Sequence, residues 1–183
     1  MKLDKAIDLI FAAEGGYVND LNDAGGETIF GIARRSHPKS KIFELLDYWK
    51  SKGNTDPKIL TKMAKDSEIY YLAKEIYQKE YWNKCRCDEL PDLHRYPLFD
   101  CAVNLGVKQA CKLYQRALFV KDDGTIGPKT IAAAKATNPD SVLRGFFERW
   151  GEFYTALVES KPSNQKFLQG WRNRIKHAKA NNS

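Results

Sequence analysis

Apolar residues recur at helical spacing from the start of the chain. Between Leu3 and Ala13 they follow the three- and four-residue steps that predict an amphipathic helix, and Gly15 and Gly16 predict its end. Position 14 continues the apolar stripe. Glu14 is therefore expected at the C-terminal end of this helix, on its apolar side.

The same periodicity predicts helices over most of the remaining chain. They are expected at about 41 to 51, about 57 to 65, about 67 to 83, around Gly106 as two helices or as one helix bent there, after Pro128, and from Pro139. Asn138 is the expected N-cap of the last of these. Turn-forming Asn, Asp and Gly residues fill the region from 17 to 31, where "GETIFGIA" is the one plausible short strand. The expected fold is mainly α, a helical bundle with one small β-hairpin excursion near residues 17–33.

Two prolines interrupt the helical pattern in "CDELPDLHRYP". The stretch from Pro91 to Pro97 is therefore the best internal boundary. It divides the chain into lobes of residues 1–90 and 91–183, which we expect to pack as one globular unit.

The composition is that of a soluble globular protein, with 43% hydrophobic and 29% charged residues. No run approaches the roughly 18 apolar residues that a membrane span needs, and Asp4 and Asp8 interrupt the N-terminal stripe. We expect no stable membrane insertion, no signal peptide, and synthesis in the cytoplasm.

The net charge of +7 favours an anionic partner, whether a nucleic acid, an anionic membrane surface or a cell-wall polymer. Charge does not choose among the three, and a solvated basic C-terminal tail would account for much of it. No nucleic-acid-binding motif accompanies the charge, so we expect no nucleic acid partner.

The four cysteines, Cys85, Cys87, Cys101 and Cys111, match no common zinc spacing. Buried thiols in a reducing compartment are the expected state. No His-Glu-x-x-His motif is present either. We expect neither a metal nor a cofactor.

The carboxylates around the first helix end carry the candidate chemistry. Burial and the negative end of a helix dipole both disfavour a charged carboxylate, which is the condition wanted in a general acid, although a Glu at this position can also simply reach solvent. Asp23 follows Glu14 by nine residues, and a turn-rich loop can fold back to face the two carboxyl groups across a cleft. Glycosidic bond cleavage needs such a pair. Asp20 is the competing partner, with an Asx-turn as its alternative role.

Other residues are candidates for contacts with a sugar. Thr28 could hold a water or a polar group near the anomeric carbon, or could be an ordinary strand residue. Tyr17 could stack on a pyranose ring or belong to the core. Asp100 and Asn104 lie four apart, so one helical face could present both to a sugar, or they could form a polar stripe.

The stretch "EGGYVNDLNDAGGETIFGIA" resembles the signature of the glycoside hydrolase family 108 muramidases, and its Glu, Asp, Thr order is similar to that of phage-type lysozymes. The second half, with "LFDCAVNLG", "CKLYQRAL", "DDGTIGPKT" and "FLQGWRNRI", is similar to the peptidoglycan-binding region that accompanies this family. Together these stretches extend over nearly the whole chain.

The resemblance implies an α+β lysozyme-like fold, with a catalytic lobe in residues 1–90 and a peptidoglycan-binding lobe in 91–183. It implies Glu14 as the catalytic acid of an endolysin-like N-acetylmuramidase, acting on the β-1,4 bond between N-acetylmuramic acid and N-acetylglucosamine. The expected partner is therefore the glycan strand of peptidoglycan, and the protein is expected to be a monomer. Release from the cytoplasm through a holin or by lysis, as for phage and prophage endolysins, is the expected route to the wall.

Two other functions fit the same residues. A lytic transglycosylase would use one Glu on the same bond, with the muramic 6-hydroxyl replacing water. A non-catalytic wall-binding protein would use Glu14 only structurally.

Overall fold

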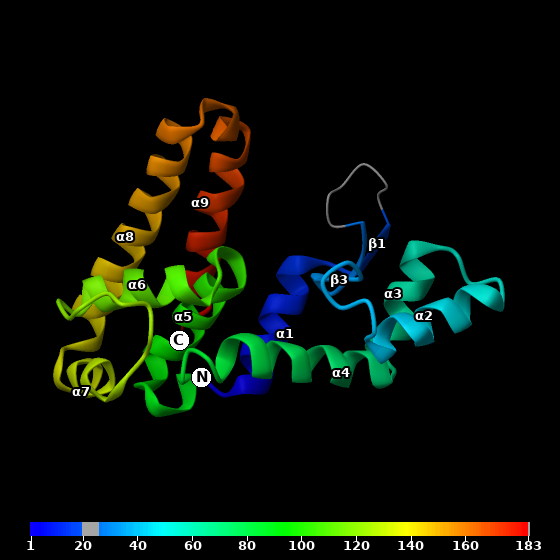
Figure 1. Cartoon of the computed structure of the whole chain (residues 1–183), viewed down its shortest axis with the longest axis horizontal. Helices are drawn as coiled ribbons and strands as arrows, with labels where there is room; N and C mark the ends of the chain where they lie inside the picture. Colours follow the sequence, from blue (N-terminus) through cyan, green and yellow to red (C-terminus); the bar gives the residue numbers. More distant parts are fainter. Residues whose placement is uncertain (20–25, 183) are drawn as a thin grey trace. The chain divides into compact units, whose positions relative to one another are not determined.

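The computed structural model of the chain describes residues 1–19 and 26–182. The chain divides into two compact units, Leu3–Gln78 and Lys79–Ser183 with Met1–Lys2 (Figure 1). The expectation of a mainly α, lysozyme-like fold with one small β region is confirmed.

The unit Leu3–Gln78 combines four helices with a small antiparallel sheet among its described residues (Figure 1). The elements are α1 (Leu3–Glu14), β1 (Tyr17–Asn19), β2 (Glu27–Ile29), β3 (Ile32–Ala33), α2 (Lys41–Ser51), α3 (Pro57–Lys65) and α4 (Glu68–Tyr77). Helix α1 ends at Glu14, as its sequence pattern predicts.

The sheet has the order β1-β2-β3, with Tyr17 opposite Ile29 and Thr28 opposite Ala33. The expectation of one strand over "GETIFGIA" was wrong, because the stretch folds into two strands joined by a two-residue turn at Phe30 and Gly31. Both turn residues have positive φ, 50° and 76°. This geometry suits a tight hairpin turn, and glycine is the residue that adopts it without strain.

Local capping explains the helix starts that the sequence predicts correctly. The Ser40 side chain accepts a hydrogen bond from the backbone N–H of Ile42 at the start of α2. The Asp56 carboxylate accepts two backbone N–H groups at the start of α3, where Pro57 occupies the first turn. Each cap satisfies amide groups that a helix start leaves without intrahelical partners.

The regular elements of the second unit are all helical in its described residues (Figure 1). A π-helical segment (Gln78–Trp82) follows α4, and the further elements are a 3-10 turn (Cys87–Glu89), α5 (Asp92–Leu105), α6 (Val107–Ala117), α7 (Pro128–Ala136), α8 (Pro139–Ser160), a 3-10 turn (Pro162–Asn164) and α9 (Gln165–Ala180). Gly106, with φ of 82°, separates α5 from α6 as expected. Pro97 lies inside α5, so the helix continues through this proline.

Aromatic rings run through the core of this unit. Phe146 packs edge-on to Tyr114 with 5.8 Å between ring centroids, and Trp150 lies 6.0 Å from Phe146. Tyr154 then stacks on Trp171 of α9 at 4.8 Å. The buried aromatic side chains of α8 therefore form part of the core.

Gln115 of α6 is buried and holds the turn from Asp122 to Gly127. Its amide nitrogen donates to Asp123 Oδ1 and to the Thr125 carbonyl, each at 2.9 Å, and its amide oxygen accepts the N–H of Gly124 at 2.8 Å. Both halves of one carboxamide thereby hydrogen-bond to the turn, which also buries Ile126 in the core.

The four cysteines are free and buried, and the Sγ atoms of Cys85 and Cys111 lie 3.9 Å apart. Burial raises the pKa of the Cys101 thiol well above its ordinary value. A neutral, buried thiol is a poor nucleophile, which supports a packing role for these side chains.

None of the helices in the described part of the chain combines the length and apolar character that a membrane span requires.

His94 of α5 is fully buried, and its Nδ1 lies 2.7 Å from the hydroxyl oxygen of Tyr114. Burial lowers the pKa of His94 below its ordinary value. The unfolded chain therefore takes up this proton at a higher pH than the folded chain does, and folding is disfavoured as the pH falls below about 6.5.

We expect the free energy of unfolding to decrease between pH 7.5 and pH 5, as measured by urea denaturation. In His94→Gln, which cannot titrate but can still contact Tyr114, that decrease should be smaller. An identical pH dependence in the two proteins would contradict the assignment.

Candidate active site

Glu14 lies at a point where the chain leaves α1 under tight steric constraints. Gly15 has φ of 84°, a left-handed conformation that ends the helix. A Cβ atom on Gly16 would lie 2.2 Å from Thr61 Oγ1, so only glycine lets the chain pass this close to α3. The same Thr61 oxygen accepts the backbone N–H of Tyr17 at 2.8 Å. The Gly-Gly corner therefore locks the end of α1 onto α3.

The turn between β2 and β3 packs directly against Glu14. A Cβ atom on Gly31 would lie 3.2 Å from Glu14 Oε2 and 2.6 Å from Tyr77 Oη. The Tyr77 hydroxyl donates a hydrogen bond to the carbonyl oxygen of Phe30 at 2.9 Å. The half-buried Glu14 carboxylate is thus held beside a turn that α4 fixes through Tyr77.

A second carboxylate of this unit, Glu27, is enclosed by hydrogen-bond donors. Its oxygens accept from Arg34 Nε at 2.5 Å, from Lys50 Nζ at 2.6 Å and from the Tyr17 hydroxyl at 2.8 Å. Arg34 also makes a bidentate pair with Asp47, with distances of 2.6 and 2.9 Å. The resulting network ties the sheet to α2.

Burial alone would raise the pKa of Glu27, but the hydrogen bonds from Lys50, Tyr17 and Arg34 outweigh it and lower the pKa below its ordinary value. A carboxylate held in this way stays ionised near neutral pH and cannot donate a proton. Glu27 is therefore a structural anchor of the sheet and no candidate for the general acid.

The other predicted residues of this unit have different surroundings. Tyr17 is 6% exposed and gives its hydroxyl to Glu27, so its ring packs in the core beside Ile29 and is not presented to solvent. Thr28 is half-buried in the central strand, two residues before the turn that touches Glu14. Asp20 and Asp23 lie outside the described residues.

Asp100 and Asn104 belong to the second unit. Asp100 is fully buried, and its Oδ1 accepts from Arg174 Nε at 2.6 Å, which ties α5 to α9. Asn104 is exposed and accepts a hydrogen bond from the Tyr154 hydroxyl at 2.5 Å. A charged carboxylate inside a protein needs a partner, so the buried Asp100 forms an ion pair with Arg174.

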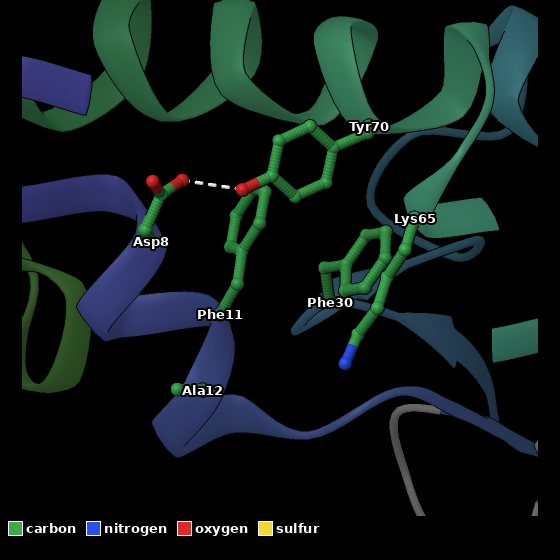
Figure 2. A pocket seen from close by; sticks show the side chains of 6 residues that line it. All are labelled: Asp8, Phe11, Ala12, Phe30, Lys65 and Tyr70. Carbon is green, nitrogen blue, oxygen red and sulfur yellow. Dashed lines mark hydrogen bonds between the residues drawn. The ribbon is translucent and has the colours of Figure 1, made fainter. Parts of the chain in front are cut away.

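A pocket of about 440 Å³ lies on the unit Leu3–Gln78, which also contains Glu14 (Figure 2). Its lining consists of Asp8, Phe11, Ala12, Phe30, Lys65 and Tyr70. The Phe11 and Phe30 rings stack with their centroids 4.9 Å apart, and the Tyr70 hydroxyl donates to Asp8. Burial raises the pKa of Tyr70 to about 12, so the hydroxyl remains a donor at neutral pH. Phe30 therefore packs against the pocket while its carbonyl fixes the turn beside Glu14.

No group of three or more His, Cys, Asp or Glu side chains within residues 1–19 and 26–182 is arranged to hold a metal ion.

Models of two known protein families match the chain. The model of the glycosyl hydrolase 108 family matches residues 7–106, which is more than half of the chain and includes Glu14, Thr28 and Gly31. The chain belongs to this glycosyl hydrolase family. A second family model, described as a predicted peptidoglycan domain, matches residues 109–176. The protein is thus a glycoside hydrolase that acts on peptidoglycan.

A solved structure agrees with this assignment. The glycosyl hydrolase is similar to the structure of Brucella abortus SagA, with a TM-score of 0.70 and 28% identity over 98% of this chain and 92% of that chain. None of the curated proteins compared with the chain matches it.

Sequence reasoning missed Gly31, Tyr77 and the partners of Glu27. Gly31 lies between the apolar pairs Ile29-Phe30 and Ile32-Ala33, a pattern that signals a two-residue hairpin turn when Phe30 is taken as the first turn residue. Tyr77 carries no comparable signal, because its hydroxyl acts on a carbonyl 47 residues away in the chain.

Gly31→Ala should reduce the peptidoglycan-hydrolysing activity of the glycosyl hydrolase by about 10²-fold, because the new Cβ displaces Glu14 and Tyr77 and a misplaced catalytic group is that costly. The measurement is the rate of release of soluble fragments from purified sacculi. Gly53→Ala is the matched control, since Gly53 also has positive φ, 88°, but has open space around it. Equal losses in both variants would show that backbone strain, and not the contact with Glu14, is responsible.

Proposed function

We propose that this chain is an N-acetylmuramidase that hydrolyses the β-1,4 bond between N-acetylmuramic acid and N-acetylglucosamine, with Glu14 as the general acid. The observation that carries the proposal is the position of Glu14, half-buried at the end of α1 and pressed against the Gly31 turn. A general acid must be held in one place to protonate the leaving oxygen efficiently.

The contrast with Glu27 supports this choice. Glu27 accepts hydrogen bonds from two cations and a phenol, which keep it ionised, whereas Glu14 lies half-buried beside the Gly31 turn. This contrast favours Glu14 over Glu27 as the proton donor.

In the proposed reaction, Glu14 gives its proton to the glycosidic oxygen as the bond to the anomeric carbon breaks. Asp23 supplies the second carboxylate, which stabilises or attacks the positive centre or activates a water, and Asp20 is the alternative for this role. Thr28 positions a water or a polar group of the sugar. The enzyme acts as a monomer on the wall, after release from the cytoplasm through a holin or by lysis.

Glu14→Gln should lower the rate of fragment release by about 10²- to 10⁴-fold, the usual contribution of a general acid. Its thermal unfolding midpoint should stay close to the wild-type value. The soluble products, identified by mass spectrometry, should carry reducing muramic ends in the wild type and be missing in the variant.

Glu27→Gln is the control for a structural carboxylate. It should lower the unfolding midpoint, because it removes the charge that compensates Arg34 and Lys50. Anhydro ends in the wild-type digest would instead identify a lytic transglycosylase. Wild-type activity in Glu14→Gln would remove Glu14 from the mechanism.

The second carboxylate can be assigned with two further variants, Asp23→Asn and Asp20→Asn. We expect Asp23→Asn to reduce hydrolysis of purified sacculi by about 10²-fold or more and Asp20→Asn to have a small effect, since only one carboxylate completes the pair. The reverse order would assign the role to Asp20. Full activity in both would mean that Glu14 acts without a second carboxylate from this loop.

A further inference from the structure

Side chains of α6 and α8, two helices of the second unit that pack together, line a groove. It has a volume of about 280 Å³ and is lined by Leu113, Arg116, Arg149, Glu152, Phe153 and Ala156. Apolar walls with a few charged groups at the rim are typical of a ligand site. All six residues fall within the region 109–176 that matches the predicted peptidoglycan domain.

Phe119, directly after α6, is unusual in two respects. It is 87% exposed, more than any other large apolar residue in the described part of the chain, and its φ is 55°, in the left-handed region. A bulky residue in that region is conformationally strained, and an exposed aromatic ring contributes little to folding. Neither property helps the fold, so the ring is better explained by something that it binds.

Arg149 connects this ring to the groove. Its guanidinium carbon lies 5.6 Å from the centre of the Phe119 ring, and its Nη1 donates to the Gly145 carbonyl at 3.1 Å. Arg116, on the other wall, is already paired with Asp122 at 2.6 Å. Arg149 has no such ion pair among the residues that the structure describes. Its guanidinium is oriented by the Gly145 carbonyl and the Phe119 ring, and it shares the groove with Glu152, so a ligand carboxylate can pair with it in place of an internal partner.

We propose that the groove and Phe119 form a wall-binding site for the muramyl peptides of peptidoglycan, separate from Glu14. A carboxylate of the peptide stem pairs with the Arg149 guanidinium, and the Phe119 ring covers an apolar face of the same glycopeptide. Peptide stems carry free carboxylates and sugar rings carry apolar C–H faces, so both groups of the site have a counterpart. The inference rests on the proposed function only in taking peptidoglycan as the ligand.

The test is co-sedimentation of the full chain with purified sacculi on ice, over a range of sacculus concentrations. Arg149→Met and Phe119→Gly should each bind about tenfold more weakly, the loss expected for one charge-assisted contact. Phe119→Gly should also unfold at the same or a higher temperature than the wild type, because glycine relieves the strain at positive φ. If the Phe119 ring had only a structural role, Phe119→Gly would unfold at a lower temperature than the wild type.

Matched controls come from the same unit. Phe167→Ala removes another exposed phenylalanine that lies under a cation, Lys166, and Arg144→Met removes a second arginine of α8, which is exposed where Arg149 is half-buried. Both should bind sacculi as the wild type does. Equal losses in the controls, or wild-type binding by Arg149→Met and Phe119→Gly, would overturn the site.

Soluble competitors in the same assay test the ligand. Muramyl peptides should displace the wild type from intact sacculi, whereas the stem-free glycan strands that an amidase releases should need about tenfold higher concentrations. Equal displacement by stem-free glycan would overturn recognition of the stem carboxylate. Fragments released by the wild type on warming are measured in parallel, so a failure of the hydrolase assignment appears as missing products and a failure of this site as unchanged binding.

Discussion

The close contact at Gly31 is the constraint on which the arrangement around Glu14 depends. Three elements meet there: the end of α1, the turn between β2 and β3, and the last residue of α4, Tyr77. No side chain fits between the tyrosine oxygen and the Glu14 carboxylate. The hairpin can therefore approach the helix end only with glycine at this position, and the strained Phe30 beside it is the conformational cost of the same turn.

Glu14 and Glu27, two glutamates of the unit Leu3–Gln78, have carboxylates in different surroundings. Glu27 accepts hydrogen bonds from Arg34, Lys50 and Tyr17, and it stabilises the sheet as a permanent anion. Glu14 lies beside the backbone turn at Gly31 instead. The difference arises from position, since Glu27 lies in a strand beside the cations of Arg34 and Lys50, while Glu14 ends a helix next to a glycine turn.

Local signals were sufficient for much of the fold. The starts of α2, α3 and α8 could be predicted because their N-cap residues act locally. The side chains of Ser40, Asp56 and Asn138 each accept a hydrogen bond from a backbone N–H two or three residues further along the chain. Contacts between distant residues could not be predicted in this way. The ion pair of Asp100 with Arg174 joins residues 74 apart, so a carboxylate that looks available on a helical face is in fact committed to a helix far along the chain. The candidate at Glu14 followed from the helix period, but Tyr77 and Gly31 required the tertiary structure.

The carboxamide of Gln115 also has a consequence for the conditions under which this protein can work. A turn rich in aspartate and glycine is often ordered by charge, and such order weakens as ions screen it. Here a buried neutral amide donates to Asp123 and the Thr125 carbonyl and accepts from Gly124, beside the ion pair of Asp122 with Arg116. The loop should therefore keep more of its shape at high salt than the ion pair alone would allow.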